Sequence, residues 1–422
     1  MMKRLLKLVN MFYENLIMDY KLDLITCQSC GLTNLQEIYN FGKVPLAGYF
    51  PLKNDSTIKP LIIMILLKCD NCQLFQVYPD VPDDNLFEDY RYLSSIAMQK
   101  HFDNFADWFI DYFKPSNEVK ILEIGSNDGP LLNALEVRGL NALGIDPAAN
   151  IAKEAINKGL KVIVDSFGQD SVELYNFKAN FDFIISCNSF AHISKINSIA
   201  AAINSSLNTH GVFVVEVQSL FDLLEYSSFD FIYHEHKYYY NLQSIENLLK
   251  RHDLNLIDAK KIDNHGGSYR LIFSKWEKNK SKALIKLLDL EKYEKFSKNS
   301  VVKSIHIFME QLKQFEYFLE ELKKTNKKII GFGASGRANM ILGYMGDPKL
   351  LIDTMYDESK ERIGRYMANS GIIIKGMDSL DKEEYDICII FAWNHAKSII
   401  EKWPHKGKKL VVPFPSLYTI DT

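Results

Sequence analysis

The densest group of residues that could do chemistry lies at 231–240, Phe-Ile-Tyr-His-Glu-His-Lys-Tyr-Tyr-Tyr. Two histidines on either side of a glutamate could ligate a metal ion. Equally, one imidazole could act as a base that a carboxylate orients. A third interpretation is packing at the start of a helix, with no chemistry. The segment alone leaves these alternatives open.

Four cysteines form two Cys-x-x-Cys pairs, Cys27 with Cys30 and Cys69 with Cys72. Each pair can direct two thiolates at one point, so together they would complete a tetrahedral zinc site without an open position, which is typical of a structural metal. The apolar run 61–67 is expected to be a strand that delivers the second pair. A redox dithiol is the alternative, but no thioredoxin-like βαβ pattern surrounds either pair.

A glycine-bearing turn follows the apolar run 119–124. Glu123, Gly125 and Gly129 form the pattern Glu-x-Gly-x-x-x-Gly, ahead of a helical pattern. Glycine lets the backbone approach a ligand closely. A second apolar run ends at Asp146, which would meet a ribose diol if both strands belong to one doubly wound sheet. An ordinary strand-turn-helix without a ligand is the alternative.

Three further apolar runs, 162–164, 181–186 and 211–217, are predicted to be strands of the same sheet. Ligands bind at the carboxyl ends of such strands. His192, which follows the second of these runs, is therefore expected at the ligand edge. The aromatic stripe at 101–113 has helical spacing and is interpreted as core packing.

The stretch 327–336 is a short strand that runs into Gly-x-Gly-x-x-Gly, and Asp357 ends the next strand. This is the fingerprint of a dinucleotide site and, taken alone, would predict a nicotinamide-dependent oxidoreductase.

The elements that position these groups belong to a chain of 422 residues, too long for one core. A hydrophobic content of 47% and a net charge of -3 are typical of a globular protein and argue against a nucleic-acid partner. No apolar run is long enough to cross a membrane. The first residues imitate a signal peptide, but polar residues interrupt the apolar part and no cleavage site follows. We expect a cytoplasmic protein.

The turn around Gly125 resembles the first motif of the class I S-adenosylmethionine-dependent methyltransferases, although Asn127 stands where that family has its middle glycine. The resemblance implies that Asp165 lies near the adenine ring. The cofactor-binding residues that it implies are Glu123, Gly125, Ser126, Asn127, Asp128, Asp146, Asp165, Ser166 and Asn188.

The combination of motifs is similar to the sugar C-methyltransferases that act on C-3 of nucleotide-linked 4-keto-6-deoxyhexoses. That family joins a zinc module, a methyltransferase core with a Tyr-His-Glu-His segment and a C-terminal Rossmann-like domain without a nicotinamide. The resemblance covers roughly residues 25–415. It implies an α/β protein with a zinc-binding module at 1–80, a class I methyltransferase domain at 81–300, and a Rossmann-like nucleotide-sugar domain at 301–422.

By the same resemblance His236 matches the general base, Tyr233 and Glu235 its supporting groups, and His192 a further active-site histidine. Arg337 stands where the family often has lysine. The substrate-binding residues implied are Tyr90, Tyr92, His234, Asn264, Gly267, Ser335, Arg337, Asn339, Asp357, Lys360, Arg365 and Trp393. For the C-terminal ones a purely structural role is the alternative.

The expected chemistry is methylation of a carbon acid. A carbonyl acidifies the adjacent C-3 proton, so that an imidazole, whose pKa is about 6.5, is a plausible base. Tyr233 and His192 would hold the enolate oxygen, and no catalytic metal is needed. Methylation of another acceptor and a nicotinamide-dependent oxidoreductase are the alternatives. We expect a monomer that binds a nucleotide-linked ketosugar, and no membrane or nucleic-acid partner; whether the nucleotide is TDP or GDP stays open.

Overall fold

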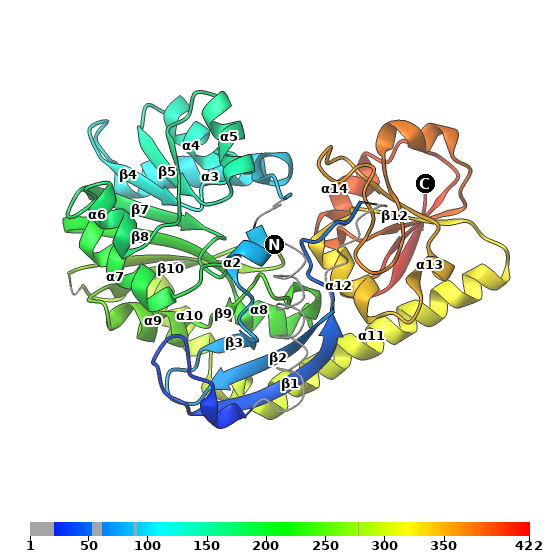
Figure 1. Cartoon of the computed structure of the whole chain (residues 1–422), viewed down its shortest axis with the longest axis horizontal. Coiled ribbons are helices and arrows are strands. Elements are labelled where there is room, and N and C mark those ends of the chain that lie inside the picture. The colour runs from blue at the N-terminus through cyan, green and yellow to red at the C-terminus, as the bar shows by residue number, and fades with distance from the viewer. Residues whose placement is uncertain (1–20, 53–60, 88–90, 277) are drawn as a thin grey trace, which may run out of the picture.

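The structure, a computed structural model, describes residues 21–52, 61–87, 91–276 and 278–422. Three sheets of four, seven and six strands organise this part of the chain. Figure 1 shows the N-terminal sheet at the bottom, the seven-stranded sheet above it and the C-terminal sheet at the right. The long helix α11 (Lys298–Lys324) runs from the N-terminal sheet towards the C-terminal one. The predicted α/β fold with two Rossmann-like sheets is confirmed.

The N-terminal sheet has the order β1-β2-β3-β9 and is antiparallel. Its last strand, β9, belongs to the histidine segment, residues 231–240. This strand pairs with β3, and Tyr239 lies opposite Phe75. The predicted strand before the second cysteine pair is confirmed as β2. The elements are η1 (Leu22–Leu24), β1 (Leu35–Val44), β2 (Ile62–Cys69), β3 (Phe75–Tyr78), α2 (Asp83–Phe87) and β9 (Tyr238–Tyr239).

The central sheet has the order β10-β11-β8-β7-β4-β5-β6. The five strands β4 to β8 are parallel, and the hairpin β10–β11 adds two antiparallel strands at one edge. These five are the strands that the sequence predicts. They are β4 (Ile121–Ile124), β5 (Ala142–Asp146), β6 (Val162–Val164), β7 (Phe181–Cys187) and β8 (Leu207–Gln218), followed by β10 (Asn255–Ile262) and β11 (Ser268–Ser274).

Helices cover both faces of this sheet, which is why all four residues of β4 are buried. The aromatic stripe of α3 forms core contacts, as predicted: Phe102, Phe105 and Phe109 are buried in one cluster. The helices are α3 (Ser94–Phe113), α4 (Pro130–Val137), α5 (Ala149–Asn157), α6 (Gln169–Leu174), α7 (Ile196–Ser206), α8 (Leu220–Glu225), η2 (Phe229–Phe231), α9 (Leu242–Lys250), α10 (Lys282–Leu290) and η3 (Tyr293–Phe296).

The C-terminal sheet has the order β14-β13-β12-β15-β16-β17, and only its last pair is antiparallel. Helix α11 buries apolar residues at helical spacing, among them Ile305, Phe308 and Leu312, so its lysines and glutamates are left for the outer face. The other elements are β12 (Ile329–Phe332), α12 (Gly336–Tyr344), α13 (Pro348–Leu351), β13 (Thr354–Asp357), β14 (Ile374–Gly376), η4 (Met377–Lys382), β15 (Ile387–Ile390), η5 (Trp393–His395), α14 (Ala396–Glu401), β16 (Lys409–Val412) and β17 (Tyr418–Asp421).

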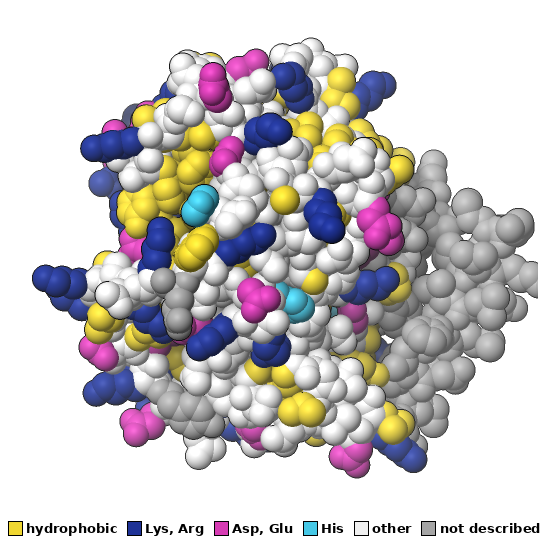
Figure 2. All heavy atoms as spheres, turned by 90° about the vertical axis from the view of Figure 1, so that its left-hand side faces the viewer, with side chains coloured by type: hydrophobic (Ala, Val, Ile, Leu, Met, Phe, Trp, Pro, Cys, Tyr) yellow, Lys and Arg dark blue, Asp and Glu magenta, His cyan; other side chains and the backbone are white. Residues whose placement is uncertain are grey.

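The predicted domain boundaries at 80 and 300 stay a prediction. Strand β9 joins the first sheet although it lies inside the second predicted range. On the face shown in Figure 2, basic and acidic side chains are both scattered over the surface. None of the helices in the described part of the chain combines the length and hydrophobicity that a membrane crossing requires.

Candidate active site

The four cysteines converge on one point. Their sulfur atoms all lie within 4.8 Å of one another, with Cys27 3.5 Å from Cys72 and Cys30 3.5 Å from Cys69. Three of the four side chains are buried. A closed set of four soft thiolates suits a tetrahedral metal ion and offers no position for a reacting water.

The turn between β4 and α4 forms the edge of the central sheet where Asp146 ends β5. Gly125 has a φ of +74°, which glycine adopts without strain, and Asn127 has a φ of +51°, which asparagine tolerates. The carboxylate of Asp146 accepts the backbone N–H of Asn127 at 2.8 Å and that of Ala148 at 2.9 Å. Asp146 therefore fixes the shape of the turn.

Three buried polar atoms at this edge lack a hydrogen-bond partner among the described residues: Oε2 of Glu123, Oγ of Ser126 and Nδ2 of Asn188. Burial raises the pKa of Glu123 well above its usual range, and Asp146 and Asp128 raise it further. Buried polar atoms are normally paired. These atoms fit a ligand that brings hydroxyl, ammonium and carboxylate groups, as S-adenosylmethionine does.

The segment before α3 covers this turn. Nδ2 of Asn127 donates to the carbonyl of Tyr92 at 3.1 Å, and its Oδ1 accepts the N–H of Ser94 at 2.9 Å. Burial raises the pKa of Tyr92 to about 12, and its hydroxyl contacts Met98. Tyr92 is thus held beside the turn. Tyr90 lies outside the described residues.

Asp165 and Ser166 lie at the end of β6. Asp165 accepts the N–H of Ser166 at 2.7 Å and the hydroxyl of Tyr175 at 3.0 Å. Asp128 accepts the N–H of Ser95 at 3.1 Å and pairs with Lys158 at 3.0 Å. Their carboxylates thus already hold protein partners.

His236 is held on both ring nitrogens. Its Nδ1 lies 3.1 Å from the carbonyl of Phe231, and its Nε2 lies 2.9 Å from the hydroxyl of Tyr233. A carbonyl only accepts, so Nδ1 carries the proton and Nε2 is the acceptor for the Tyr233 hydroxyl. Burial lowers the pKa of His236 well below its usual value, and His192 and His265 lower it further. The ring is therefore a neutral imidazole with its basic nitrogen on the Tyr233 side.

His192 lies edge-on to this ring, with the ring centroids 4.5 Å apart. Burial lowers the pKa of His192 to about 4, so it too is neutral near pH 7. The structure thus brings together three predicted catalytic residues, His236, Tyr233 and His192. A neutral imidazole and a hydroxyl in contact can remove a proton and donate a hydrogen bond.

The C-terminal sheet reaches this cluster through Arg337 of α12. The guanidinium pairs with Asp230 at 2.6 Å and lies over the rings of Phe231 (3.7 Å) and Trp393 (4.4 Å). The turn after β10 lies next to it, because a Cβ on Gly266 would come within 3.4 Å of Phe231 and 3.9 Å of Trp393. In that turn Nδ2 of Asn264 is buried without a partner among the described residues.

Comparison with known proteins identifies the chemistry. A family profile described as a methyltransferase domain matches residues 85–259, and one described as a C-methyltransferase C-terminal domain matches residues 263–415. A curated relative, the C-methyltransferase NovU of Streptomyces niveus, is 26% identical over 92% of this chain and 95% of its own length. The chain is an S-adenosylmethionine-dependent C-methyltransferase.

Two solved structures each resemble part of this methyltransferase. The PH0226 protein of Pyrococcus horikoshii OT3 covers 45% of the chain and 97% of its own length, with 17% identity and a TM-score of 0.37. The magnesium protoporphyrin IX methyltransferase of Synechocystis PCC 6803 covers 47% and 86%, with 14% identity and a TM-score of 0.33. Likenesses at this level support no conclusion about function.

Two predicted site residues of the methyltransferase contact the N-terminal module instead of His236. Glu235 accepts the N–H of Gly48 at 2.6 Å, and Nε2 of His234 donates to the carbonyl of Ile63 at 3.0 Å. His234 is 1% exposed, and burial lowers its pKa to about 4. The carboxylate of Glu235 is directed at this backbone, whereas the resemblance implied support of the base.

Several predicted substrate-binding residues are engaged within the protein. Nδ2 of Asn339 donates to the carbonyls of Ala47 (2.8 Å) and Tyr49 (3.1 Å), and its Oδ1 accepts the N–H of Ala368 (2.9 Å). Arg365 donates to the carbonyl of Phe50 at 2.9 Å. Both residues dock the 45–51 loop onto the C-terminal domain.

The remaining predicted residues of this set differ in exposure and contacts. Ser335 caps α12 through the N–H of Ala338, and Asp357 accepts the N–H of Ser359 at 2.7 Å. Lys360 is exposed. Gly267 has a φ of +118° and donates its N–H to the carbonyl of Asn264.

The dinucleotide fingerprint is covered by protein at its third glycine. A Cβ added to Gly336 would come 3.2 Å from both the Cβ and the carbonyl oxygen of Ala47. In a dinucleotide site the pyrophosphate approaches the start of this helix. Here the 45–51 loop lies against it, which argues against the oxidoreductase alternative.

A buried acid with an arginine and a histidine as partners was not expected from the sequence. Glu216 of β8 is fully buried, accepts from Arg270 at 2.7 Å and contacts Nε2 of His101 at 2.6 Å. His101 was assigned to the aromatic core stripe. The signal that could have found the cluster is an acid at the end of a buried strand, where a partner is required.

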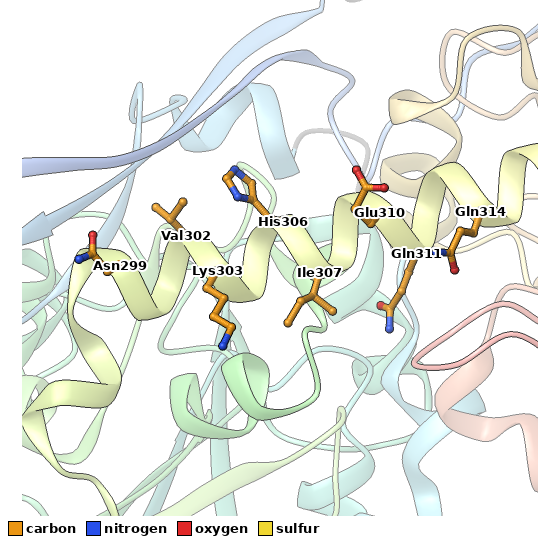
Figure 3. Close-up of a pocket in the computed structure, with 8 residues that line it drawn as sticks. All are labelled: Asn299, Val302, Lys303, His306, Ile307, Glu310, Gln311 and Gln314. Atoms are coloured by element: carbon orange, nitrogen blue, oxygen red, sulfur yellow. The ribbon is translucent and has the colours of Figure 1, made fainter.

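A hollow along α11 lies apart from these groups. Figure 3 shows that the labelled residues lining it all project from that one helix. They are Asn299, Val302, Lys303, His306, Ile307, Glu310, Gln311 and Gln314. None of the residues predicted for the site is among them.

Proposed function

We propose that this methyltransferase methylates C-3 of a nucleotide-linked 4-keto-6-deoxyhexose, with His236 as the general base. The observation that supports this most directly is the contact of Nε2 of His236 with the Tyr233 hydroxyl, while Nδ1 is fixed by a carbonyl. Methylation of carbon requires a carbanion equivalent. A neutral imidazole beside a hydroxyl donor provides the base and the group that stabilises the resulting enolate.

The proton transfer follows from the tautomer of His236. With Nδ1 protonated, only Nε2 can take the C-3 proton, and the product is an imidazolium whose Nδ1–H still donates to the Phe231 carbonyl. The C–H electron pair becomes the enolate, whose negative charge rests mainly on the C-4 oxygen. Because burial disfavours the imidazolium, the proton is removed only when the enolate is stabilised next to it.

Tyr233 has two successive partners in this scheme. Its hydroxyl occupies Nε2 of His236 before the substrate arrives. When the carbon acid approaches, that hydroxyl turns away and donates to the enolate oxygen. His192, neutral and edge-on to His236, is the second group beside the reacting carbon.

Bound S-adenosylmethionine supplies an electrophilic methyl group on a sulfonium. Glu123, Ser126 and Asn188 would hold the cofactor, because their buried polar atoms lack protein partners in the described part of the chain. The cofactor's methyl group would pass to the enolate carbon, and the sulfur would keep the electron pair of the broken C–S bond. The residues of the turn would contribute by fixing the position of the cofactor, which lowers the entropic cost of bringing the two reactants together.

The C-terminal domain would bind the nucleotide diphosphate. Arg337 and Trp393 supply a guanidinium and an aromatic face beside Phe231, whose carbonyl contacts His236, and Lys360 supplies an exposed positive charge. Ala47 lies against Gly336, where a dinucleotide would approach the helix. This contact agrees with a ligand other than a nicotinamide dinucleotide.

The four cysteines would hold a structural zinc ion. Their sulfur atoms meet the requirement for a Cys₄ site, and the module carries Gly48 and Ile63, which contact Glu235 and His234. Zinc would thereby stabilise the module on which the histidine segment rests.

Mass spectrometry of reactions with S-adenosylmethionine and a panel of TDP- and GDP-linked 4-keto-6-deoxyhexoses tests the proposal. We expect one panel member to gain one methyl group, and NMR of that product to place the methyl on C-3. Gain at another carbon, or at oxygen, would contradict the assignment. No gain on any member, with S-adenosylmethionine bound, would favour a different acceptor.

A further inference from the structure

Asp230 is a buried carboxylate that lies six residues before His236 and binds the C-terminal domain. Its Oδ2 accepts from Nε of Arg337 at 2.9 Å, from Nη2 of Arg337 at 2.6 Å and from Nε1 of Trp393 at 2.9 Å. Its side chain is 1% exposed and that of Arg337 is 11% exposed. Burying such a pair carries a large desolvation cost, so its presence calls for a role beyond stability.

Arg337 also contacts the aromatic ring of Phe231, the residue that follows Asp230. The guanidinium of Arg337 lies 3.7 Å above the ring of Phe231 and 4.4 Å from that of Trp393, and its Nη1 donates to Asn394 at 2.9 Å. Asp230 and Phe231 are consecutive residues of η2. Arg337 therefore makes two contacts with this short helix, one with the Asp230 carboxylate and one with the Phe231 ring.

The carbonyl of Phe231 is the group that fixes the proton on His236. It accepts from Nδ1 of His236 at 3.1 Å and from the hydroxyl of Tyr239 at 3.2 Å. Tyr239 in turn accepts the N–H of Tyr233 at 3.2 Å. A small displacement of this carbonyl would release Nδ1 and allow the proton to sit on Nε2, so that the nitrogen on the Tyr233 side could no longer accept a proton.

We propose that Asp230 and Arg337 are positioning residues through which the C-terminal domain holds the Phe231 carbonyl and thereby keeps the proton of His236 on Nδ1. The inference rests on the proposed role of His236 as the base. It assigns Arg337 a second task besides contact with a nucleotide, and it assigns Asp230 a role for the first time. The base is then competent only when α12 is docked on η2.

The test is ¹⁵N NMR of the full-length protein labelled in its histidine rings, combined with kinetics. The signal of His236 is the one missing from the spectrum of His236→Asn. In the unsubstituted protein we expect the Nδ1–H form alone at pH 7. In Asp230→Asn we expect an additional Nε2–H form and a kcat about 10²-fold lower, with KM changed little.

Asp107→Asn is the matched control, because Asp107 also pairs with an arginine, Arg138 at 2.6 Å, but is exposed on α3. It should leave the His236 signal and kcat unchanged. If Asp230→Asn fails to fold, the double variant Asp230→Asn/Arg337→Gln leaves neither charge unpaired and carries the same test.

The inference would be overturned if Asp230→Asn, or the double variant, kept both the His236 tautomer and the kcat of the unsubstituted protein. Loss of kcat with an unchanged tautomer would also overturn it, because the effect would then be merely structural. Turnover that survives His236→Asn is a separate result: it would refute the proposed function, whatever the spectra show.

Discussion

The hydroxyl of Tyr233 donates to Nε2 of His236 at 2.9 Å, and the Phe231 carbonyl holds the opposite ring nitrogen. This relationship fixes which nitrogen is basic and places a hydrogen-bond donor beside it. Tyr233 and His236 are three residues apart, so one short segment supplies both the proposed base and the donor. The site is then completed from other parts of the chain.

Tyr233→Phe tests the role of the hydroxyl. We expect kcat to fall about 10²-fold with little change in KM, because the lost hydrogen bond is the one that stabilises developing charge. Tyr238→Phe is the matched control, since the Tyr238 hydroxyl is buried without a partner among the described residues. Steady-state kinetics of both variants give the kcat of each. An equal fall in kcat in the two variants would argue against a specific role of Tyr233.

Glu123→Gln tests the cofactor edge. Its Oε2 is buried and has no partner within the described residues, so we expect this oxygen to bind the cofactor. The substitution should then raise the Kd for S-adenosylmethionine about tenfold. Isothermal titration calorimetry gives the Kd. Glu136→Gln, an exposed change on α4, should leave it unaltered. An unchanged Kd in Glu123→Gln would remove Glu123 from the cofactor site.

Much of this edge could be predicted from the sequence, because apolar runs that end in polar residues are a local signal of parallel strands. The contacts of Glu235 with Gly48 and of His234 with Ile63 could not, because they join residues far apart in the chain. The sequence placed Glu235 beside a histidine. Only packing of the N-terminal module decides that its carboxylate accepts the N–H of Gly48.

The Glu216 cluster was missed for a different reason. His101 shares a helical stripe with Phe102 and Phe105, so its spacing indicates core packing. The acid that gives His101 its partner lies on a strand of the central sheet, and nothing local in the sequence connects the two. Asp230 escaped notice in the same way, since its partner Arg337 lies on another sheet's helix.

His234 makes stability depend on pH. Its pKa is about 4 in the folded protein and about 6.5 in the unfolded chain. Between these two pH values the unfolded chain therefore binds a proton at His234 and the folded protein does not. Stability is therefore lost as pH falls from about 6.5 to about 4. We expect His234→Gln to reduce this loss by about 2 kcal/mol at pH 4.5 relative to pH 7.

Urea unfolding at the two pH values measures that difference. An unchanged pH dependence in His234→Gln would mean that His234 is protonated in the folded protein, contrary to its burial and to an Nδ1 without a partner among the described residues.

Removal of the proposed zinc ion tests the structural role of the cysteines. We expect Cys69→Ser, or chelation, to unfold the N-terminal module and to lower the Tm, with the loss of activity following the loss of structure. Cys388→Ala, a buried cysteine in the C-terminal sheet, is the control and should keep its metal content. A zinc-free protein that stays folded but inactive would refute the structural role.

The most direct test of the account compares His236→Asn with the unsubstituted methyltransferase in two assays, methyl transfer to the accepted substrate and S-adenosylmethionine binding. The account predicts that turnover is abolished while the Kd for the cofactor stays within about twofold, because His236 removes the proton and the cofactor is held at the turn after β4. Turnover that persists in His236→Asn would contradict it, since another group would then be the base.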